Sequence, residues 1–183
     1  MATAEMLMTA REFRLRPDPG HPEELVRGRI VAMPPPNRRH GQVCSNAVFI
    51  LRRYIDEHDL GHVLSNDSGV ITERNPDTVR GADVCFYSYA KLPKGPLPSS
   101  YGPEVPELVV EVRSPGDRWT EILVKVAEYL SAGVKVVCIL DPDAQVAQII
   151  EPDGPLRVLS ANDELSFPTL LGDFRVRVGR FFE

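Results

Sequence analysis

Two acidic residues lie within apolar, strand-like segments, where an ionised carboxylate needs a positive partner. Glu111 stands in the middle of the segment 106–115, and Asp83 lies in the segment 82–88. Burying such a carboxylate without a cation, an ion-pair partner or water is costly. Two carboxylates brought together on neighbouring strands repel each other unless a divalent cation lies between them, and carboxylate oxygens suit Mg²⁺ or Mn²⁺. The pair therefore predicts a metal site.

A metal ion held by these carboxylates would be suited to hydrolysing a phosphodiester bond. It would bind the scissile phosphate, lower the pKa of an attacking water and offset the charge on the leaving oxygen. A lysine close to the ion would orient that water or stabilise the transition state. A second interpretation stays open for the central strand, because Glu111 and Arg113 share a face and can simply neutralise each other.

The two clearest helical patterns lie before and after the acidic strands in the sequence. Apolar residues at three- and four-residue spacing predict a helix at about 40–58 and another at about 118–132. Asp117 is placed to cap the second helix. Lys125 flanks the apolar stripe of this helix, where it can reach back over the sheet or form a surface pair with Glu121.

Strand patterns account for most of the remaining chain. Short apolar or alternating segments separated by turn residues predict a series of strands. Residues 91–106 form a proline-rich loop, and an unstructured connection of this length is uncommon unless it is functional or mobile. We expect an α/β fold, a mixed sheet flanked by two main helices. The predicted strands are 24–33 in two parts, 61–65, 69–72, 82–88, 106–115, 134–140, 145–150, 156–160 and an edge strand within 167–183, and a short helix is predicted at 9–16.

The composition fits one globular domain in a reducing compartment. The length of 183 residues predicts a single domain, 1–183, with an N-terminal extension at 1–20. No segment approaches the roughly 18 consecutive apolar residues of a membrane helix, and residues 1–17 carry charges in place of an apolar leader segment. The three cysteines are widely spaced in apolar sequence and suit free thiols. We therefore expect a cytoplasmic protein with no membrane partner.

Arginines concentrate in one part of an otherwise acidic chain. The net charge is −5, yet the stretch from Leu25 to Ile55 contains no Asp or Glu. Such a basic lobe is what a phosphate backbone would contact, and we expect Arg38 and Arg39, near the start of the first main helix, to bind DNA. An exposed helix face and a turn would give the same pattern, because charge runs are usually just solvated. The arginines of the stretch are Arg27, Arg29, Arg38, Arg39, Arg52 and Arg53.

Taken together, the motifs resemble a known family. The order of acidic strand, loop, Glu-x-basic strand and helix is similar to that of the PD-(D/E)XK nuclease superfamily, and more closely to that of a bacterial family of putative restriction endonucleases. The resemblance covers about 23–182. It rests on Glu-Leu-Val-Arg-Gly at 24–28, Pro35, His40, Ala82-Asp83-Val84, the stretch 106–115 with Val-Val-Glu-Val-Arg-Ser-Pro, Lys125 with Tyr129, Ala-Gly-Val at 132–134 and Asp141-Pro142.

The resemblance implies a restriction-endonuclease-like core and a role for individual residues. Asp83 and Glu111 would be the metal carboxylates, with the backbone carbonyl of Val112 as a third ligand. In that family the lysine usually lies on the helix that follows the glutamate strand, and Lys125 matches it. The implied cofactor is Mg²⁺ or Mn²⁺, and the implied substrate is DNA.

Further residues carry over less directly. Glu24 would be an additional acid near the metal, and His40 would face the same cleft. Arg113 holds the position of the superfamily lysine, but an arginine stays protonated and cannot accept a proton, so the lysine role is assigned to Lys125. Ala82 stands where the superfamily name has proline, a residue whose part is structural.

Three functions compete on these observations. The first is a Mg²⁺-dependent DNA endonuclease, expected to be a homodimer because cutting both strands of a duplex is simplest with two related sites. The second is a catalytically inactive nuclease fold used for nucleic-acid binding or assembly, motivated by the net acidity and by Arg113. The third is a hydrolase with a cysteine nucleophile. Only Cys44 has a histidine nearby, His40, and its place on an apolar helix face favours a core role.

Overall fold

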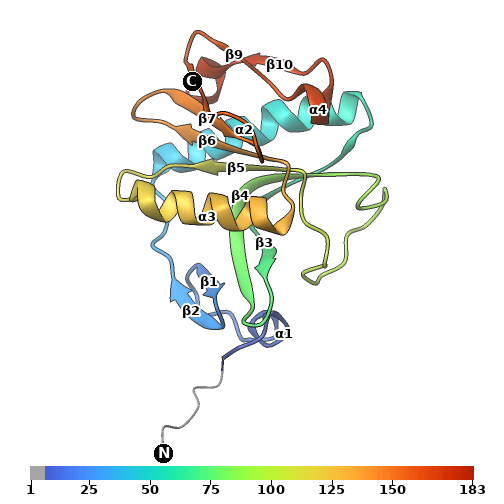
Figure 1. Cartoon of the computed structure of the whole chain (residues 1–183), viewed down its shortest axis with the longest axis vertical. Helices are drawn as coiled ribbons and strands as arrows, with labels where there is room; N and C mark the ends of the chain where they lie inside the picture. The colour runs from blue at the N-terminus through green and yellow to red at the C-terminus, as the bar shows by residue number, and fades with distance from the viewer. Residues whose placement is uncertain (1–6) are drawn as a thin grey trace, which may run out of the picture.

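The computed structural model describes residues 7–183, which fold around an eight-stranded mixed sheet with helices on both faces (Figure 1). Residues 1–6 lie outside this range. They begin the predicted extension at 1–20 and the segment interpreted as lacking a leader, so those two predictions fall partly outside the described residues. None of the helices within 7–183 combines the length and the hydropathy of a membrane-spanning segment.

The predicted α/β fold is confirmed, and most elements lie close to their predicted positions. The sheet order is β2-β1-β4-β5-β6-β7-β8, and β3 pairs with the other edge of β4. Only β5 and β6 are parallel neighbours, with a helix between them in the chain. The strands are β1 Glu23–Val26, β2 Arg29–Ala32, β3 Gly61–Glu73, β4 Thr78–Ser88, β5 Leu108–Val112, β6 Val136–Asp141, β7 Val146–Ile150, β8 Arg157–Ser160, β9 Glu164–Ser166 and β10 Arg175–Arg177. The helices are α1 Ala10–Arg14, α2 Arg38–Glu57, α3 Trp119–Ala132, α4 Pro168–Leu171 and the 3₁₀ helix η1 Val178–Phe181.

Two strands predicted at 61–65 and 69–72 are one long strand, β3. It pairs with β4 along almost its whole length, with a shift of register between Ser65 and Ser68. Asn66 and Asp67 have positive φ angles of 65° and 53° at this bulge, a conformation that Asn and Asp adopt more readily than most residues. The polar sequence Asn-Asp-Ser-Gly therefore marks a bulge inside a strand and not a break between strands.

The strand β4 is longer than predicted, and one of its edges is shared by two partners. It pairs with β1 at Leu25 and Val79 and with β5 from Val84 and Val110 onward. Between these pairings, residues 80–83 of β4 face a fork where β1 and β5 separate. Asp83 thus lies in the middle of β4 beside this fork and not at the start of the strand, as predicted.

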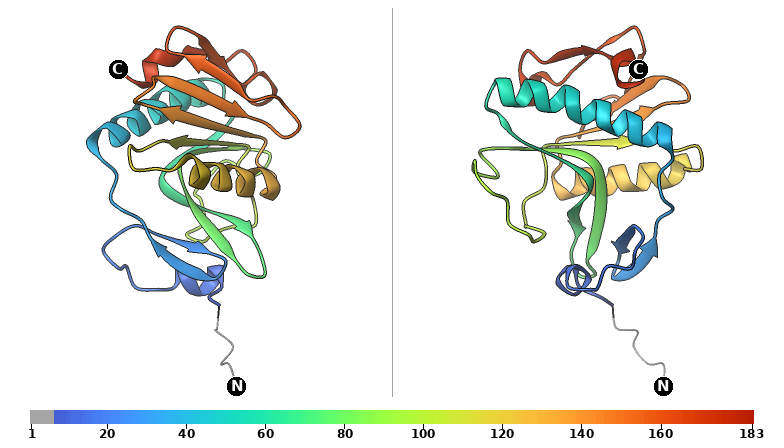
Figure 2. Two further views of the ribbon diagram at one scale, coloured as in Figure 1. Left: turned by 60° about the vertical axis from the view of Figure 1, so that its left-hand side comes forward. Right: turned by 180° about the vertical axis from the view of Figure 1, so that it is seen from behind.

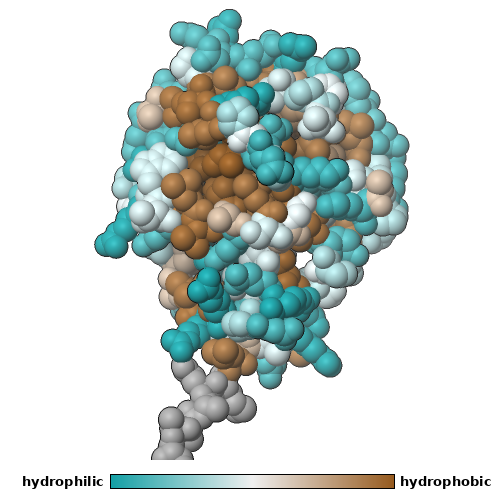
Figure 3. Space-filling model, in the orientation of Figure 1, coloured by the Kyte–Doolittle hydropathy of each residue, from teal (hydrophilic) through white to brown (hydrophobic). Residues whose placement is uncertain are grey.

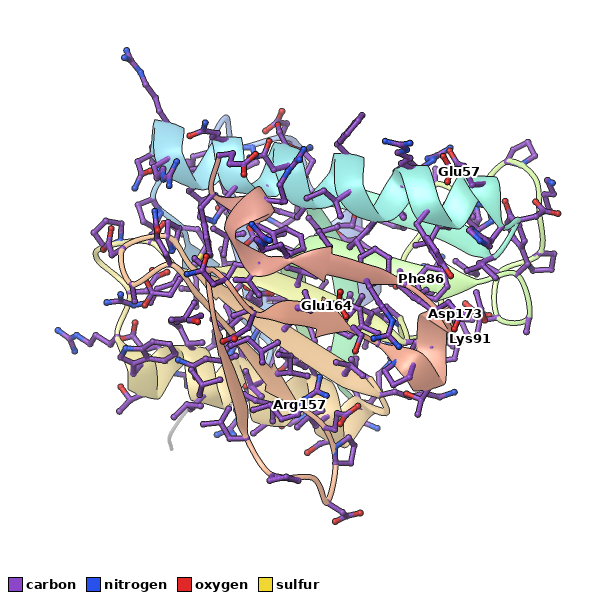
Figure 4. All side chains as sticks on the ribbon, turned by 90° about the horizontal axis from the view of Figure 1, so that it is seen from above. Glu57, Phe86, Lys91, Arg157, Glu164 and Asp173 are labelled. Carbon is purple, nitrogen blue, oxygen red and sulfur yellow. The ribbon has the colours of Figure 1, made fainter. Side chains whose placement is uncertain are left out.

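The helices α2 and α3 cover opposite faces of the sheet (Figures 1 and 2). Alternate residues of β4 and β5 feed the two cores, with Phe86 under α2 and Tyr87 under α3. Figure 4 views this arrangement from above, with the sheet between the two helices. Side chains three residues apart on a regular strand face opposite sides of the sheet. Ala82 and Cys85 nevertheless both belong to the core under α3, so the alternation of side chains between the two faces shifts by one residue around Asp83. This shift lies opposite the β3 bulge.

The C-terminal segment supports α2. The predicted edge strand, β10, pairs with β9 in a separate two-stranded sheet. Asn46 on α2 donates hydrogen bonds from its amide to the carbonyl oxygens of Phe181 and Glu183, at 3.0 and 2.8 Å. The aromatic residues of this segment pack into the same core as α2. The position of α2 is therefore fixed from both the sheet and the chain end.

The helices α1 and α3 begin differently. Thr9 caps α1 through a reciprocal pair of hydrogen bonds with Glu12. Asp117 does not cap α3: its carboxylate accepts a hydrogen bond from the Ser114 amide at 2.7 Å, and the capping position is Arg118 without a side-chain bond. The proline-rich loop 91–106 joins β4 to β5 without a helix or strand.

Candidate active site

The structure brings Asp83 and Glu111 together at the fork of the sheet. The pairing of Val84 with Val110 places Asp83 opposite Glu111 when the register is continued by one residue. The backbone amide of Val112 donates a 2.7 Å hydrogen bond to Asp83 Oδ2. The Asp83 carboxylate also helps to raise the pKa of Glu111, as a nearby like charge does. The predicted carboxylate pair is therefore a spatial cluster, with Val112 beside it.

Glu111 lies in an environment that disfavours its charge. Burial raises its pKa to about 8, although the ammonium of Lys125 acts in the opposite direction. The hydroxyl of Tyr129 donates a 2.9 Å hydrogen bond to Glu111 Oε1. Burial therefore favours the protonated form of Glu111 when no metal is bound, and a divalent cation would favour the ionised form.

Arg113 does not neutralise Glu111. Its guanidinium donates a 3.0 Å hydrogen bond to Asp141 Oδ2 and lies over the Trp119 ring, 5.3 Å from the ring centre. The interpretation in which Glu111 and Arg113 form a local ion pair is wrong, because Arg113 points to the neighbouring strand β6. Arg113 therefore links the end of β5 to β6 beside the site.

Lys125 reaches back from α3 over the fork, and the predicted alternative of a surface pair with Glu121 is wrong. Its Nζ lies 2.8 Å from Glu24 Oε1 and 4.0 Å from Glu111 Oε2. Burial lowers the pKa of Lys125, but Glu111 and Glu24 outweigh that effect and raise it above its ordinary value. Lys125 is therefore a charged group held between two acids.

Glu24 belongs to a buried ion network that sequence reasoning did not find. Arg80 donates to Glu24 Oε2 at 2.7 Å and to both carboxylate oxygens of Glu128, at 2.6 and 3.0 Å. The amide of Gly81 donates to Glu24 Oε1 at 3.1 Å. Burial works against the charge of Glu24, yet Lys125 and Arg80 hold its pKa below its ordinary value. Glu24 is therefore a charged support for Lys125.

Arg80 and Glu128 carried a sequence signal that was overlooked. Glu128 interrupts the apolar stripe of α3 only three residues after Lys125, and Arg80 stands next to the apolar Val79 in β4. Both are 7% exposed. Charged residues are almost never buried unless they are paired, so each needed a partner of opposite sign.

His40 faces Asp83 from the first turn of α2. Its Nε2 lies 3.3 Å from Asp83 Oδ2, and its Nδ1 lies 3.5 Å from the Sγ of Cys44. Burial lowers the pKa of His40, but Asp83 more than offsets this and raises it. Cys44 is partly buried, and burial raises the pKa of its thiol far above the ordinary value. A nucleophilic cysteine needs a lowered pKa, so the structure does not favour the cysteine hydrolase.

An open cleft of about 630 Å³ leads to Asp83 and His40 from the α2 side. Asp67, at the β3 bulge, lies on its wall. Burial raises the pKa of Asp67, and the Asp83 carboxylate adds to the shift. This acid was not predicted, because the positive φ angles that turn the chain here cannot be read from hydrophobic periodicity. The cleft gives Asp67 and Asp83 access to solvent. Its further lining residues are Pro36, Gly41, Cys44, Ser45, Val48, Phe49, Arg52, Arg53, Ser65 and Asn66.

The basic lobe is only partly available to a ligand. Arg52 pairs with Asp56 and Arg53 with Glu57, each four residues apart on α2. Arg38 and Arg39 open the same helix, at the end that carries His40. For Arg52 and Arg53 the alternative of a solvated helix face is supported.

The side chains of the fork fit a hard divalent cation. Burial is the main cause of the raised pKa values of Asp67 and Glu111, and the charge of Asp83 adds to both. The four acids Glu24, Asp67, Asp83 and Glu111 also carry a formal excess of negative charge over Lys125 and Arg80. Oxygen ligands from Asp83 and Glu111 suit Mg²⁺ or Mn²⁺. A cation bound there would relieve this excess.

Known proteins with a related sequence pattern or fold are described as nucleases. The model of the Uma2 family, described as "Putative restriction endonuclease", matches residues 10–179 of this chain. The chain is also similar to the crystal structure of a putative nuclease belonging to DUF820 from Anabaena variabilis ATCC 29413, with a TM-score of 0.83 and 17% identity over 96% of this chain and 97% of that chain. That likeness concerns the fold alone. No match was found among curated proteins.

Proposed function

Because the chain belongs to the Uma2 family, described as putative restriction endonucleases, we propose that it is a metal-dependent DNA endonuclease of the PD-(D/E)XK type. The observation that carries the proposal is the meeting of Asp83 and Glu111 at the fork, with Lys125 Nζ 4.0 Å from Glu111. Two acids and a lysine that act on one another, with Asp83 on the wall of an open cleft, are groups that could hydrolyse a phosphodiester together with a bound metal ion.

Each residue has a defined task in this proposal. The carboxylates of Asp83 and Glu111, with the backbone carbonyl of Val112, hold Mg²⁺ or Mn²⁺. The bound ion supplies Lewis acidity and lowers the pKa of a water. Lys125 orients the attacking water or stabilises the transition state from the side of α3. The amide of Val112 fixes the Asp83 carboxylate through its 2.7 Å bond.

Neighbouring residues support this set. Glu24 holds Lys125 in place through the 2.8 Å ion pair. His40 contacts Asp83 on the cleft side at 3.3 Å. Arg113 is occupied by Asp141 and is always protonated, so Lys125 and not Arg113 fills the role of the lysine. Arg38 and Arg39 would contact the DNA backbone at the open end of α2.

We include in the proposal that the active protein is a homodimer. The outer face of α3 exposes Leu123 and Val124, each about half exposed. Figure 3 shows apolar residues gathered on the same side of the molecule. Apolar patches of this kind mark interaction sites. Light scattering of the wild type and of Leu123→Glu checks the dimer, which fails if the wild type is a monomer at all concentrations used for cleavage.

Cleavage of plasmid DNA in Mg²⁺ or Mn²⁺ tests the central proposal. We expect Asp83→Asn, Glu111→Gln and Lys125→Met each to lower the rate by about 10²-fold or more, because each removes a group that acts on the reacting phosphate. Glu121→Gln, an exposed acid on the helix of Lys125, is the matched control and keeps full activity. Cleavage that survives both carboxylate substitutions refutes the proposed site.

A catalytically inactive nuclease fold that binds nucleic acid or supports assembly is the second candidate. The observation in its favour is that Lys125 already forms an ion pair with Glu24, while burial favours the protonated form of Glu111. Calorimetry with Mn²⁺ separates the two candidates. Binding that disappears in Glu111→Gln supports the enzyme, and no binding at millimolar Mn²⁺ supports the inactive fold.

A further inference from the structure

Three side chains with different ligand chemistry meet where α2 faces β4. His40, Cys44 and Asp83 each present one ligand atom, and these atoms lie within 4.8 Å of one another. His40 and Cys44 are four residues apart on α2, so they occupy the same face of the helix. Paired ligands at this helical spacing are a recurring way to hold zinc. Asp83 completes a set of three from a second element.

The surroundings of these residues favour a cation that keeps one open position. The cleft of about 630 Å³ is lined by all three side chains, so a water can reach the fourth position of a tetrahedral site. The Val112 amide orients the Asp83 carboxylate, which is the kind of hydrogen bond that supports metal ligands. Asp67 and Glu111 add negative potential at Cys44. A divalent cation would therefore enter a site that is already electronegative.

We propose that His40, Cys44 and Asp83 form a binding site for Zn²⁺ or a similar divalent cation that takes nitrogen and sulfur ligands. One ring nitrogen of His40, the thiolate of Cys44 and a carboxylate oxygen of Asp83 bind the ion, and water fills the fourth position. The thiol proton of Cys44 passes to solvent as the S–metal bond forms. Thiolate and imidazole ligands select Zn²⁺ over Mg²⁺, which prefers oxygen.

This site is different from the proposed magnesium site in its ligands and in its test. It uses His40 and Cys44, whereas the magnesium site uses Glu111 and Val112, and only Asp83 is shared. The binding of Zn²⁺ does not depend on nuclease activity. Glu111→Gln and Cys44→Ser therefore distinguish the failure of one proposal from the failure of the other.

Titration of the full-length, metal-free protein with Co²⁺ tests the site, because a cobalt–thiolate bond gives a charge-transfer absorption band. We expect the band in the wild type, its displacement by Zn²⁺, and its loss in Cys44→Ser. We expect His40→Gln to weaken Co²⁺ binding by more than about 100-fold, which exceeds the roughly 10- to 100-fold effect of removing an outer hydrogen bond. Glu111→Gln keeps the band, and Mg²⁺ does not displace the ion.

Other outcomes overturn the proposal. A band that persists in Cys44→Ser but vanishes in Cys138→Ser or Cys85→Ser places the thiolate elsewhere, and absence of a band in the wild type removes the site. Circular dichroism confirms that each variant is folded before titration. Because Cys44 is only partly buried whereas Cys85 and Cys138 are buried, Cys44→Ser is the mildest of these changes.

Discussion

Replacing Arg80 by methionine should destabilise the protein strongly, although the residue lies outside the proposed metal ligands. Arg80 is 7% exposed and donates three hydrogen bonds, two to Glu128 and one to Glu24. Methionine keeps much of the length and apolar packing of the side chain but removes its charge and donors. The substitution therefore isolates the electrostatic contribution of the network.

The two acids that lose Arg80 are not affected equally. Glu24 keeps the ammonium of Lys125 at 2.8 Å and the amide of Gly81 at 3.1 Å. The two hydrogen bonds described for Glu128 both come from Arg80, so this acid is left buried without its cation. Removing one partner of a buried ion pair costs about 3–5 kcal/mol. That is a large part of the roughly 5–15 kcal/mol by which domains are stable.

Urea denaturation of the metal-free protein measures this loss as a change in the free energy of unfolding. Arg175→Ala is the control, because Arg175 pairs with Glu164 on the surface and the loss of an exposed ion pair should change the stability little. The double variant Arg80→Met with Glu128→Met should regain about half of the loss or more, because two apolar side chains can replace a buried pair.

Two results would refute this reasoning. Arg80→Met could lose no more stability than Arg175→Ala, which would mean that water solvates Glu128 when Arg80 is absent. Alternatively, the loss of unfolding free energy in the double variant could equal the sum of the losses in the two single variants. The unpaired charge of Glu128 would then not be the cause of the destabilisation.

Three further predictions concern the fork itself. Between about pH 4.5 and 8, the metal-free folded chain keeps a proton on Glu111 that the unfolded chain releases. The free energy of unfolding of the wild type, measured by urea titration relative to Glu111→Gln, should therefore fall as pH rises. The fall should be at most about 1.4 kcal/mol per pH unit. A flat difference contradicts the raised pKa. Lys125→Met should raise the pKa of Glu111 further, so the fall in the free energy of unfolding should continue to higher pH. An unchanged pH range for this fall would show that Lys125 does not act on Glu111. Gly81→Ala would bring a Cβ to 2.9 Å from the Asp67 side chain, and we expect a loss of about 1–3 kcal/mol in thermal or urea unfolding, with a neutral result showing that the bulge can shift.

The strands and main helices could be predicted because their patterns are local. Apolar residues at helical spacing predicted α2, and the apolar run around Glu111 predicted β5, since each pattern depends only on which faces are buried. The partner of the C-terminal strand could not be predicted, because the pairing of a strand depends on residues outside its own local pattern. β10 has a partner, β9, that lies outside the main sheet.

The site could be predicted in part, for the same physical reason. A buried carboxylate requires compensation, and this requirement identified Asp83 and Glu111 before their distance was known. It applied equally to Arg80 and Glu128, which were not considered. Asp67 is different, since it reaches the cleft only through the bulge at positive φ. Backbone irregularities of this kind depend on the pairing of β3 with β4, which no local pattern specifies.

The proline-rich loop 91–106 divides the fork into two pieces of chain. Glu24, His40 and Asp83 precede it, whereas Glu111 and Lys125 follow it. A chain cut within this loop would leave one proposed carboxylate ligand on each fragment. The fragments would be joined through the β4 and β5 pairing, the two cores, and ion pairs such as that of Lys125 with Glu24. Metal affinity would then report whether the fragments have reassociated, which makes this protein a natural candidate for fragment complementation.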